Sequence, residues 1–225
     1  GIPAGLFARQ MALVEKRRAA WLDIAEKATP ALIRTAKKPL AVITVAPDPA
    51  AFQGWKIGAT ADVASVCDRP LKPGDSFILD FGEHLTGYAR LSLRAFDVPV
   101  DAPVRLALIF GEVLAEVTEP FDPYTGGLTR AWLQDETLNV DVVPQTVSLP
   151  RRYAFRYLKV TVVSCSTHGK FGFADIGAEA VISADEKRLA PFTPAGAEDA
   201  ALDRVARATL RDCMQTVFED GPKRD

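Results

Sequence analysis

Two carboxylates and a guanidinium lie close together in the last six residues of the sequence, DGPKRD at 220–225. Hydrolysis of a glycosidic bond needs one protonated carboxyl beside the leaving oxygen and a second carboxylate opposite it. Carboxylates and arginine also serve as partners for sugar hydroxyls. Asp220, Arg224 and Asp225 could supply such groups on a turn fixed by Pro222. Proline just beyond a helix is equally typical of an ordinary helix exit, so the spacing alone leaves both interpretations open.

Few other residues indicate chemistry. The sequence has no GxSxG, P-loop, HExxH or GxGxxG motif. His84, beside Glu83, could belong to a small acid–imidazole site, but a histidine near a turn is more often a surface or packing residue. Glu112 follows a predicted strand, and a turn-capping or ion-paired role is favoured there over a buried acid.

The cysteines give no metal motif. Cys67, Cys165 and Cys213 are far apart, and only His84 and His168 could add imidazole ligands. Buried or partly buried thiols are favoured over a zinc site or a disulfide. We therefore expect neither a metal nor a cofactor.

Composition sets broad limits on function. Among the 225 residues, 48% are hydrophobic and 25% are charged, which is typical of a globular protein, and the net charge is −2. That balance provides no basic surface for nucleic acid or for an anionic membrane, so neither is expected as a partner. No apolar run approaches the roughly 18 residues of a membrane span.

The start of the chain gives little information about its compartment. The first residue is Gly1 rather than Met, so we expect the natural start to lie upstream or to have been removed. No signal peptide is visible. A periplasmic or secreted location is favoured over a cytoplasmic one.

Short alternating strands dominate the middle of the chain. The clearest is residues 88–94, where Arg90, Ser92 and Arg94 are expected to face solvent and Leu91 and Leu93 the core. Residues 157–162 repeat this pattern. Further strands are expected, with turns between them, at 40–45, 55–59, 76–81, 87–96, 104–113, 138–143, 153–164 and 174–183. The pattern favours a mainly β fold, an antiparallel sandwich, over a parallel sheet.

Helical segments flank these strands. An apolar stripe predicts a helix over residues 6–28, and a second short helical piece is expected over 31–36. A wide apolar stripe predicts a last helix over 197–218, with Glu198 and Asp199 in its first turn. That helix must bury its stripe either on the sandwich or in a following helical domain.

One long segment lacks a clear pattern. Residues 115–136 carry Phe121, Tyr124 and Trp132 beside several carboxylates. A loop of this length in a compact domain is commonly functional or mobile. The composition suits stacking on a sugar or docking to another domain, although a structural flap without a ligand is favoured.

Four stretches, in order along the chain, resemble bacterial α-L-rhamnosidases of glycoside hydrolase family 78. Residues 78–88 (ILDFGEHLTGY) are similar to the family's "DFG…GW/Y" strand–turn–strand, and residues 110–114 (FGEVL) to its "AEVL" strand end. Residues 152–160 (RYAFRYLKV) resemble its "F-RY" strand. Residues 210–225 resemble the start of the catalytic domain, with its "D-x-P-x-R-D/E" signature, and this last match is the most specific.

The resemblance implies a jelly-roll-like β-sandwich before an (α/α)6 barrel, whose first helix would be the last helix of this chain. The implied domains are an N-terminal helical segment (1–38), a β-sandwich (39–190) and a linker with the first helix of a truncated catalytic barrel (191–225). Asp220 and Arg224 would bind sugar. Asp225 takes the position of the general acid in part of the family, whereas other members have a Glu one residue later. Gly221 replaces a frequent Cys.

The resemblance also implies a partner and a substrate. The general base of the family lies far downstream, so the missing C-terminal catalytic domain would be the partner and a rhamnose-containing glycoside or oligosaccharide the substrate of an inverting hydrolase. The fragment itself is expected to be inactive. Two alternatives remain: a freestanding carbohydrate-binding sandwich that stacks sugars on Trp55, Tyr124 or Trp132, and a purely structural or interaction module.

Overall fold

A computed structural model describes residues 4–67 and 69–223. Within them the chain is mainly β, with nine strands in one antiparallel hydrogen-bonded system. The strands are β1 (Ile33–Lys37), β2 (Ala41–Pro47), β3 (Trp55–Ala61), β4 (Ser76–Ala95), β5 (Val104–Gly111), β6 (Asp135–Val140), β7 (Gln145–Ser148), β8 (Tyr153–Ser164) and β9 (Phe171–Ile182). The helices are α1 (Ala4–Ala28), α2 (Ala64–Cys67), α3 (Leu114–Thr118) and α4 (Ala197–Cys213).

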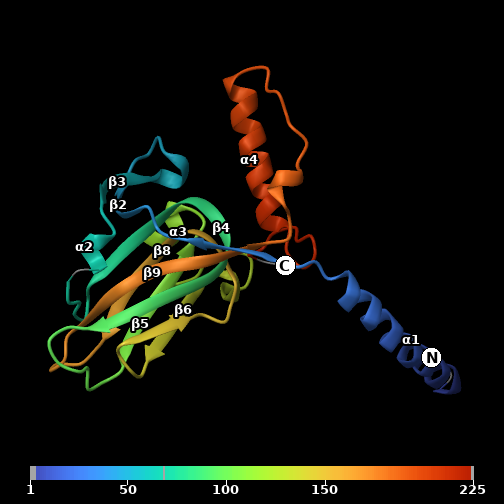
Figure 1. Cartoon of the computed structure of the whole chain (residues 1–225), viewed down its shortest axis with the longest axis horizontal. Helices are drawn as coiled ribbons and strands as arrows, with labels where there is room; N and C mark the ends of the chain where they lie inside the picture. The colour runs from blue at the N-terminus through green and yellow to red at the C-terminus, as the bar shows by residue number, and fades with distance from the viewer. Residues whose placement is uncertain (1–3, 68, 224–225) are drawn as a thin grey trace.

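The long strand β4 connects the whole sheet. Its first half pairs with β2 and β8, and its second half pairs with β7 and β9. β5 and β6 extend the first group beyond β8, and β1 extends the second group beyond β9. The prediction of an antiparallel, mainly β fold between two terminal helices is therefore confirmed (Figure 1).

β4 bends sharply near its middle. A straight strand advances about 3.3 Å per residue and would separate Phe77 from Leu93 by about 50 Å. Yet Phe173, which pairs with Leu93, lies with its ring centroid only 5.9 Å from that of Phe77. The two halves of β4 therefore face each other across the core, and the ribbon of β4 curves accordingly in Figure 1.

The bend has a local cause. The register between β4 and β8 shifts between Asp80 and Leu85, and Gly82 adopts a positive φ of 80° that favours glycine. The Gly82 amide donates to Asp80 Oδ1 at 2.7 Å, and the buried Asp80 also accepts two hydrogen bonds from Arg156 at 2.8 and 2.9 Å. These contacts fix the bulge that carries Glu83 and His84.

The core lies between the two halves of the folded sheet. Leu91 and Leu93 of β4 are buried while Arg90 and Arg94 are exposed, as their alternation predicted. The largest fully buried hydrophobic side chains come from four different strands. They include Leu79, Phe110, Tyr153, Phe155, Phe171 and Phe173. A smaller cluster of Ile43, Val117 and Tyr157 lies apart from this core, with Leu114 of α3 packed against it.

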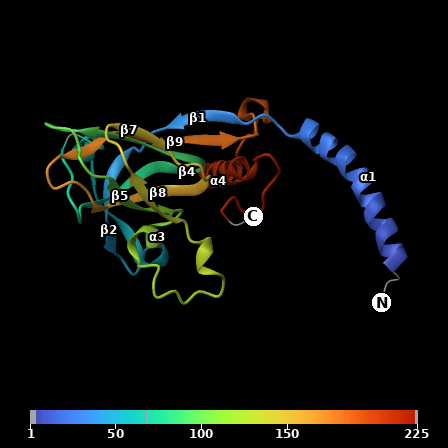
Figure 2. The same cartoon turned by 90° about the horizontal axis from the view of Figure 1, so that it is seen from below.

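Several local predictions need correction. The short helical piece expected over 31–36 is wrong, because Ile33–Lys37 forms β1 and pairs with β9. The loop expected over 115–136 contains α3 and the start of β6, so the irregular part is shorter (Figure 2). The last helix ends at Cys213 rather than 218, and the side-chain amide of Gln215 donates to the carbonyl oxygen of Asp212 at this end.

The two terminal helices bury little surface. Every described side chain of α1 is exposed, and α1 projects away from the sheet in both views (Figures 1 and 2). α4 reaches the sheet only at its C-terminal end, where Asp212 and Cys213 are buried. None of the described helices combines the length and the apolar content that crossing a membrane requires. The jelly-roll connectivity, the barrel and the domain boundaries at 38/39 and 190/191 stay predictions.

Gly87 lies where β4 passes from β8 to β9, pairing with Tyr153 on one side and Ala180 on the other. A Cβ added there would lie 2.2 Å from the carbonyl oxygen of Glu179 and 2.8 Å from the Cα of Ala180. We expect Gly87→Ala to lower the free energy of unfolding by more than about 2 kcal/mol, measured by urea denaturation. Gly127→Ala, with no atom within 4 Å of the added Cβ, is the control. Equal stability of the two variants would contradict this account of the bend.

Candidate functional site

The predicted site residues lie at the end of the described chain. Asp220 is exposed in the turn after α4 and lines a pocket of ≈ 440 Å³. His84, Glu112 and Asp212 line the same pocket. Arg224 and Asp225 lie outside the described residues, so their predicted roles stay predictions. The neighbours of Asp220 are therefore the part of the site that the structure defines.

His84 lies between two carboxylates. Its Nδ1 is 2.6 Å from Asp212 Oδ2, and its Nε2 is 3.0 Å from Glu112 Oε1. The three side chains come from the bulge of β4, the C-terminal end of α4 and the segment after β5. One imidazole therefore joins the sheet to the last helix.

This arrangement favours the imidazolium form. Burial alone would lower the pKa of His84, but the hydrogen bonds to Asp212 and Glu112 raise it to about 9. For the carboxyl of Glu112, burial acts in the opposite direction and would raise the pKa. The hydrogen bond with His84 and the charge of Lys223 outweigh burial, so the pKa of Glu112 is lowered. A general acid needs a raised pKa, so Glu112 is suited to an ion pair and not to proton donation.

A second cation fixes the terminal turn itself. Lys223 Nζ lies 3.3 Å from Glu112 Oε2 and also pairs with Glu116 of α3. Its side chain is only 6% exposed, and Glu116 in turn accepts a 2.8 Å hydrogen bond from the Glu112 amide. The turn that begins at Asp220 is thus attached to the sheet one residue before Arg224.

Asp212 is held from several directions. Its Oδ1 accepts from Arg211 Nε at 2.8 Å, and its carbonyl oxygen accepts from Thr86 Oγ1 at 3.2 Å. Arg211 also approaches Glu83 and Glu186, at 3.5 and 3.6 Å. The Asp212 side chain is only 5% exposed, and these partners compensate its buried charge and keep it in one orientation.

Arg152 of the segment before β8 makes a third attachment. It donates two hydrogen bonds to the carboxylate of Glu219, both at 2.7 Å, and one to Gln215 Oε1 at 3.1 Å. The side-chain amide of Gln215 donates to the Val181 carbonyl oxygen near the end of β9. Residues 212–223 are therefore bound to β4, to β9 and to the segments after β5 and before β8.

Sequence reasoning underestimated this network. The ion-paired role predicted for Glu112 is confirmed, but His84 is more than a packing residue near a turn, because it connects two elements. Its contact with Asp212 spans 128 residues of sequence, so no local pattern indicates it. Within the sequence, only the Gly82-Glu83-His84 segment indicated locally that an acid–imidazole site could lie here.

The aromatic residues predicted for sugar stacking do not form one surface. The Trp55 indole donates to Glu119 at 2.8 Å, and Tyr124 lines a separate pocket of ≈ 460 Å³ with Phe121. Trp132 is half-buried and lines neither that pocket nor the one beside Trp55.

The three cysteines are buried or half-buried, and the described residues offer no metal site. Cys213 is buried, and Cys67 and Cys165 are half-buried, as predicted. Across 4–67 and 69–223, no group of three or more His, Cys, Asp or Glu side chains is arranged to hold a metal ion.

Comparison with known proteins places these features in a family. Residues 39–180 match the model described as the glycosyl hydrolase family 78 α-rhamnosidase N-terminal domain. A rhamnosidase from Klebsiella oxytoca, solved with rhamnose bound, has 44% sequence identity and a TM-score of 0.83. The match covers 92% of this chain and 40% of that one, so this chain spans less than half of the relative's length.

A more distant structure shares the fold. The family 78 rhamnosidase of Bacillus sp. GL1 has 19% identity and a TM-score of 0.53, over 75% of this chain and 17% of that one. Among curated proteins, no sequence matches this chain.

The pKa of His84 predicts how stability varies with pH. Because the folded-state value lies above the usual 6.5, the stabilisation is complete below about pH 6.5 and is lost as the pH rises through about 9. We expect His84→Gln to lower the free energy of unfolding by about 2 kcal/mol at pH 6, after allowance for solvent screening, and by little at pH 10.

Chemical denaturation across this pH range measures the effect. His168→Gln, at an exposed imidazole, is the control and should change stability by less than about 0.5 kcal/mol at every pH. Parallel pH curves for the natural chain and His84→Gln would contradict the ion-pair assignment.

Proposed function

The chain belongs to the glycosyl hydrolase family 78 α-rhamnosidase N-terminal domains, and we propose that its parent protein is an inverting α-L-rhamnosidase. The enzyme would remove terminal rhamnose from glycosides or oligosaccharides. The observation that carries this proposal is the 44% identity to a rhamnosidase solved with rhamnose, combined with the family match over 39–180. In this proposal the catalytic domain follows the present chain, and the protein is active outside the cytoplasm.

We assign the terminal turn to the active site of that enzyme. Asp220 and Arg224 would bind the sugar, and Asp225 would be the general acid. Support comes from the anchoring of Lys223 to Glu112 and Glu116 and of Glu219 to Arg152, since catalytic groups must be held within fractions of an ångström. The sheet would thus orient the segment that carries the acid.

The helix before the turn presents an apolar side that a further domain could cover. Leu202 and Val205 of α4 are 64% and 61% exposed, and Val217 in the following turn is 65% exposed. Burial of such side chains contributes about 1.5–3 kcal/mol each. We propose that a helical catalytic domain buries them, with α4 as its first helix.

Residues 1–225 alone would be inactive in this scheme. An inverting site needs two carboxyl groups about 6.5–9.5 Å apart, with room for a water molecule between the base and the sugar. Near Asp220, the carboxylates of Glu112 and Asp212 are occupied by His84, Lys223 and Arg211, so neither is suited to activate water.

A carbohydrate-binding sandwich without catalysis is the second candidate. The observation that favours it is the pocket beside Tyr124 and Phe121, which combines aromatic rings with Glu116 and Glu119. Sugar binding there by a protein that remains inactive after extension through the downstream gene would support this candidate over the first.

Activity measurements test the main proposal. We expect residues 1–225 to release no rhamnose from a nitrophenyl rhamnoside, and the protein extended through its downstream reading frame to release it. In the extended protein, Asp225→Asn should lower kcat by about 100-fold or more. Asp141→Asn, at an exposed position outside the terminal turn, is the control.

Two results would contradict this proposal. One is rhamnose release by residues 1–225 themselves. The other is an extended protein without glycosidase activity. Full activity of Asp225→Asn would transfer the acid role to a later residue while leaving the family assignment intact.

Hydrogen exchange tests the proposed cover of α4. Amides of Ala197–Cys213 should exchange quickly in residues 1–225 and at least about ten times more slowly in the extended protein, because only the latter would bury the apolar side. Amides of β8, already buried in the core, are the control and should be protected in both. Strong protection of α4 in a monomer of residues 1–225 would argue against a missing helical domain.

A further inference from the structure

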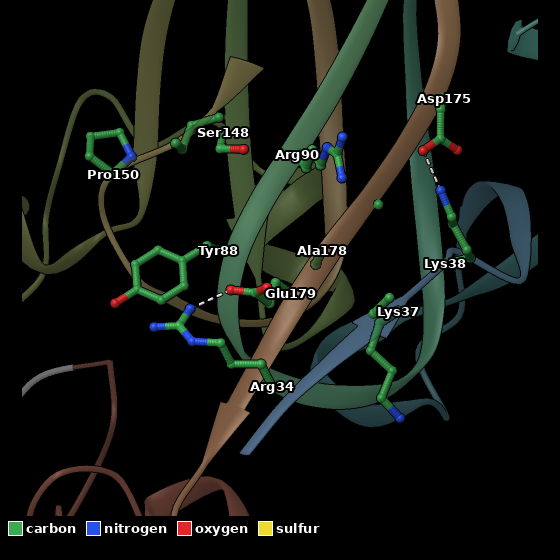
Figure 3. Close-up of a pocket in the computed structure, with 13 residues that line it drawn as sticks. Arg34, Lys37, Lys38, Tyr88, Arg90, Ser148, Pro150, Asp175, Ala178 and Glu179 are labelled. Atoms are coloured by element: carbon green, nitrogen blue, oxygen red, sulfur yellow. Dashed lines mark hydrogen bonds and ion pairs between the residues drawn. The ribbon is translucent and has the colours of Figure 1, made fainter. Parts of the chain in front are cut away.

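A pocket lies on the outer face of the sheet, away from the terminal turn (Figure 3). Its volume is ≈ 480 Å³, within the range of small-molecule sites. It is formed by β1, β4 and β9 together with the segment after β7. None of the residues that line it belongs to the terminal turn or its ion pairs.

The register explains which side chains meet in this pocket. Tyr88 of β4 pairs with Glu179 of β9, which pairs with Ala36 of β1. Directly paired residues in an antiparallel sheet point to the same face. These three residues therefore form one row on the outer surface.

The neighbouring row combines a cation with a glycine. Arg90 pairs with Ser148 on one side and with Gly177 on the other. Gly177 has no side chain, so no side chain lies between those of Asp175 and Glu179 on this face of β9. A Cβ at Gly177 would lie 2.9 Å from the carbonyl oxygen of Lys37 and 3.4 Å from Lys38 Cδ, so the end of β1 passes close to this position.

The lining carries an excess of positive charge. Four basic residues, Arg34, Lys37, Lys38 and Arg90, accompany two acidic ones, Asp175 and Glu179. Arg34 pairs with Glu179, Lys38 pairs with Asp175, and Lys37 pairs with Glu83 at 2.5 Å. Arg90 is exposed, and its guanidinium makes no hydrogen bond or ion pair to any residue in the described part of the chain. Its guanidinium is available for an anion.

The geometry points to an acidic oligosaccharide as the ligand. We propose that Arg90 binds the carboxylate of a uronic acid residue, that the Tyr88 ring packs against the apolar face of a sugar, and that Asp175 and Glu179 accept sugar hydroxyls with their remaining lone pairs. The two fixed carboxylates disfavour a dianionic phosphate more than a monoanionic carboxylate. The proposal rests on the proposed function only in taking a glycan as the ligand.

Calorimetric titration of residues 1–225 with trigalacturonic acid tests this site. We expect saturable binding, weakened at least about ten-fold when the carboxylates of the probe are methyl-esterified. Arg90→Gln should weaken binding to a similar extent, and Tyr88→Leu should weaken it as well. Because binding is measured without hydrolysis, the result is independent of whether the extended protein is a rhamnosidase.

Arg94→Gln is the matched control. Arg94 lies on the same strand and is exposed like Arg90, but its guanidinium lies over the Phe96 ring and does not line the pocket. Its replacement changes the net charge equally and should leave affinity unchanged. Thermal denaturation should show that each variant is folded.

Four results would overturn the proposal. They are the absence of binding at millimolar probe, equal affinity for the methyl ester, equal weakening by Arg90→Gln and Arg94→Gln, and displacement of the probe by inorganic phosphate at equal concentration.

Discussion

A single half-buried imidazole joins the parts of this molecule that matter most for function. His84 extends from the bulge of β4 and holds Asp212 at the end of α4 on one side and Glu112 after β5 on the other. Removing such a charge would leave two partly buried carboxylates facing each other, which is costly in a low-dielectric environment. Two further ion pairs hold the same region: Lys223 binds Glu112, and Arg152 binds Glu219, which lies between Asp212 and the terminal turn. The position of the last described residues therefore depends on a histidine more than a hundred residues earlier in the sequence.

The bend of β4 makes this contact possible. A straight strand of that length could not contribute to both halves of the core, nor could it project His84 from its middle toward α4. Gly82 supplies the positive φ, Asp80 and Arg156 fix the bulge, and Gly87 lets the strand pass closely beside β9. The fold is therefore a support on which one edge holds the terminal turn and an outer face presents Tyr88 and Arg90.

The sequence predicted what local patterns control. Period-two alternation identified the buried and exposed faces of residues 88–94, and the strand over 153–164 has the predicted bounds. Contacts distant in sequence were not predictable in this way. Ile33–Lys37 carries a short apolar pattern compatible with a helix, yet it forms a strand because β9 offers a free edge about 145 residues later. The early end of α4 likewise depends on the side chain of Gln215 and its bonds to Asp212 and Val181.

The candidate site likewise has features that the sequence predicts and features that only the fold reveals. The chemical types at Asp220, Arg224 and Asp225 and the family resemblance were visible in the sequence, whereas the partners of His84 and Lys223 required the fold. The most direct test is an NMR titration of the two histidine side chains, with the exposed His168 as an internal reference. The account predicts a pKa of about 9 for His84. A value near the ordinary 6.5 would contradict the claim that a charged imidazole attaches the terminal turn to the sheet.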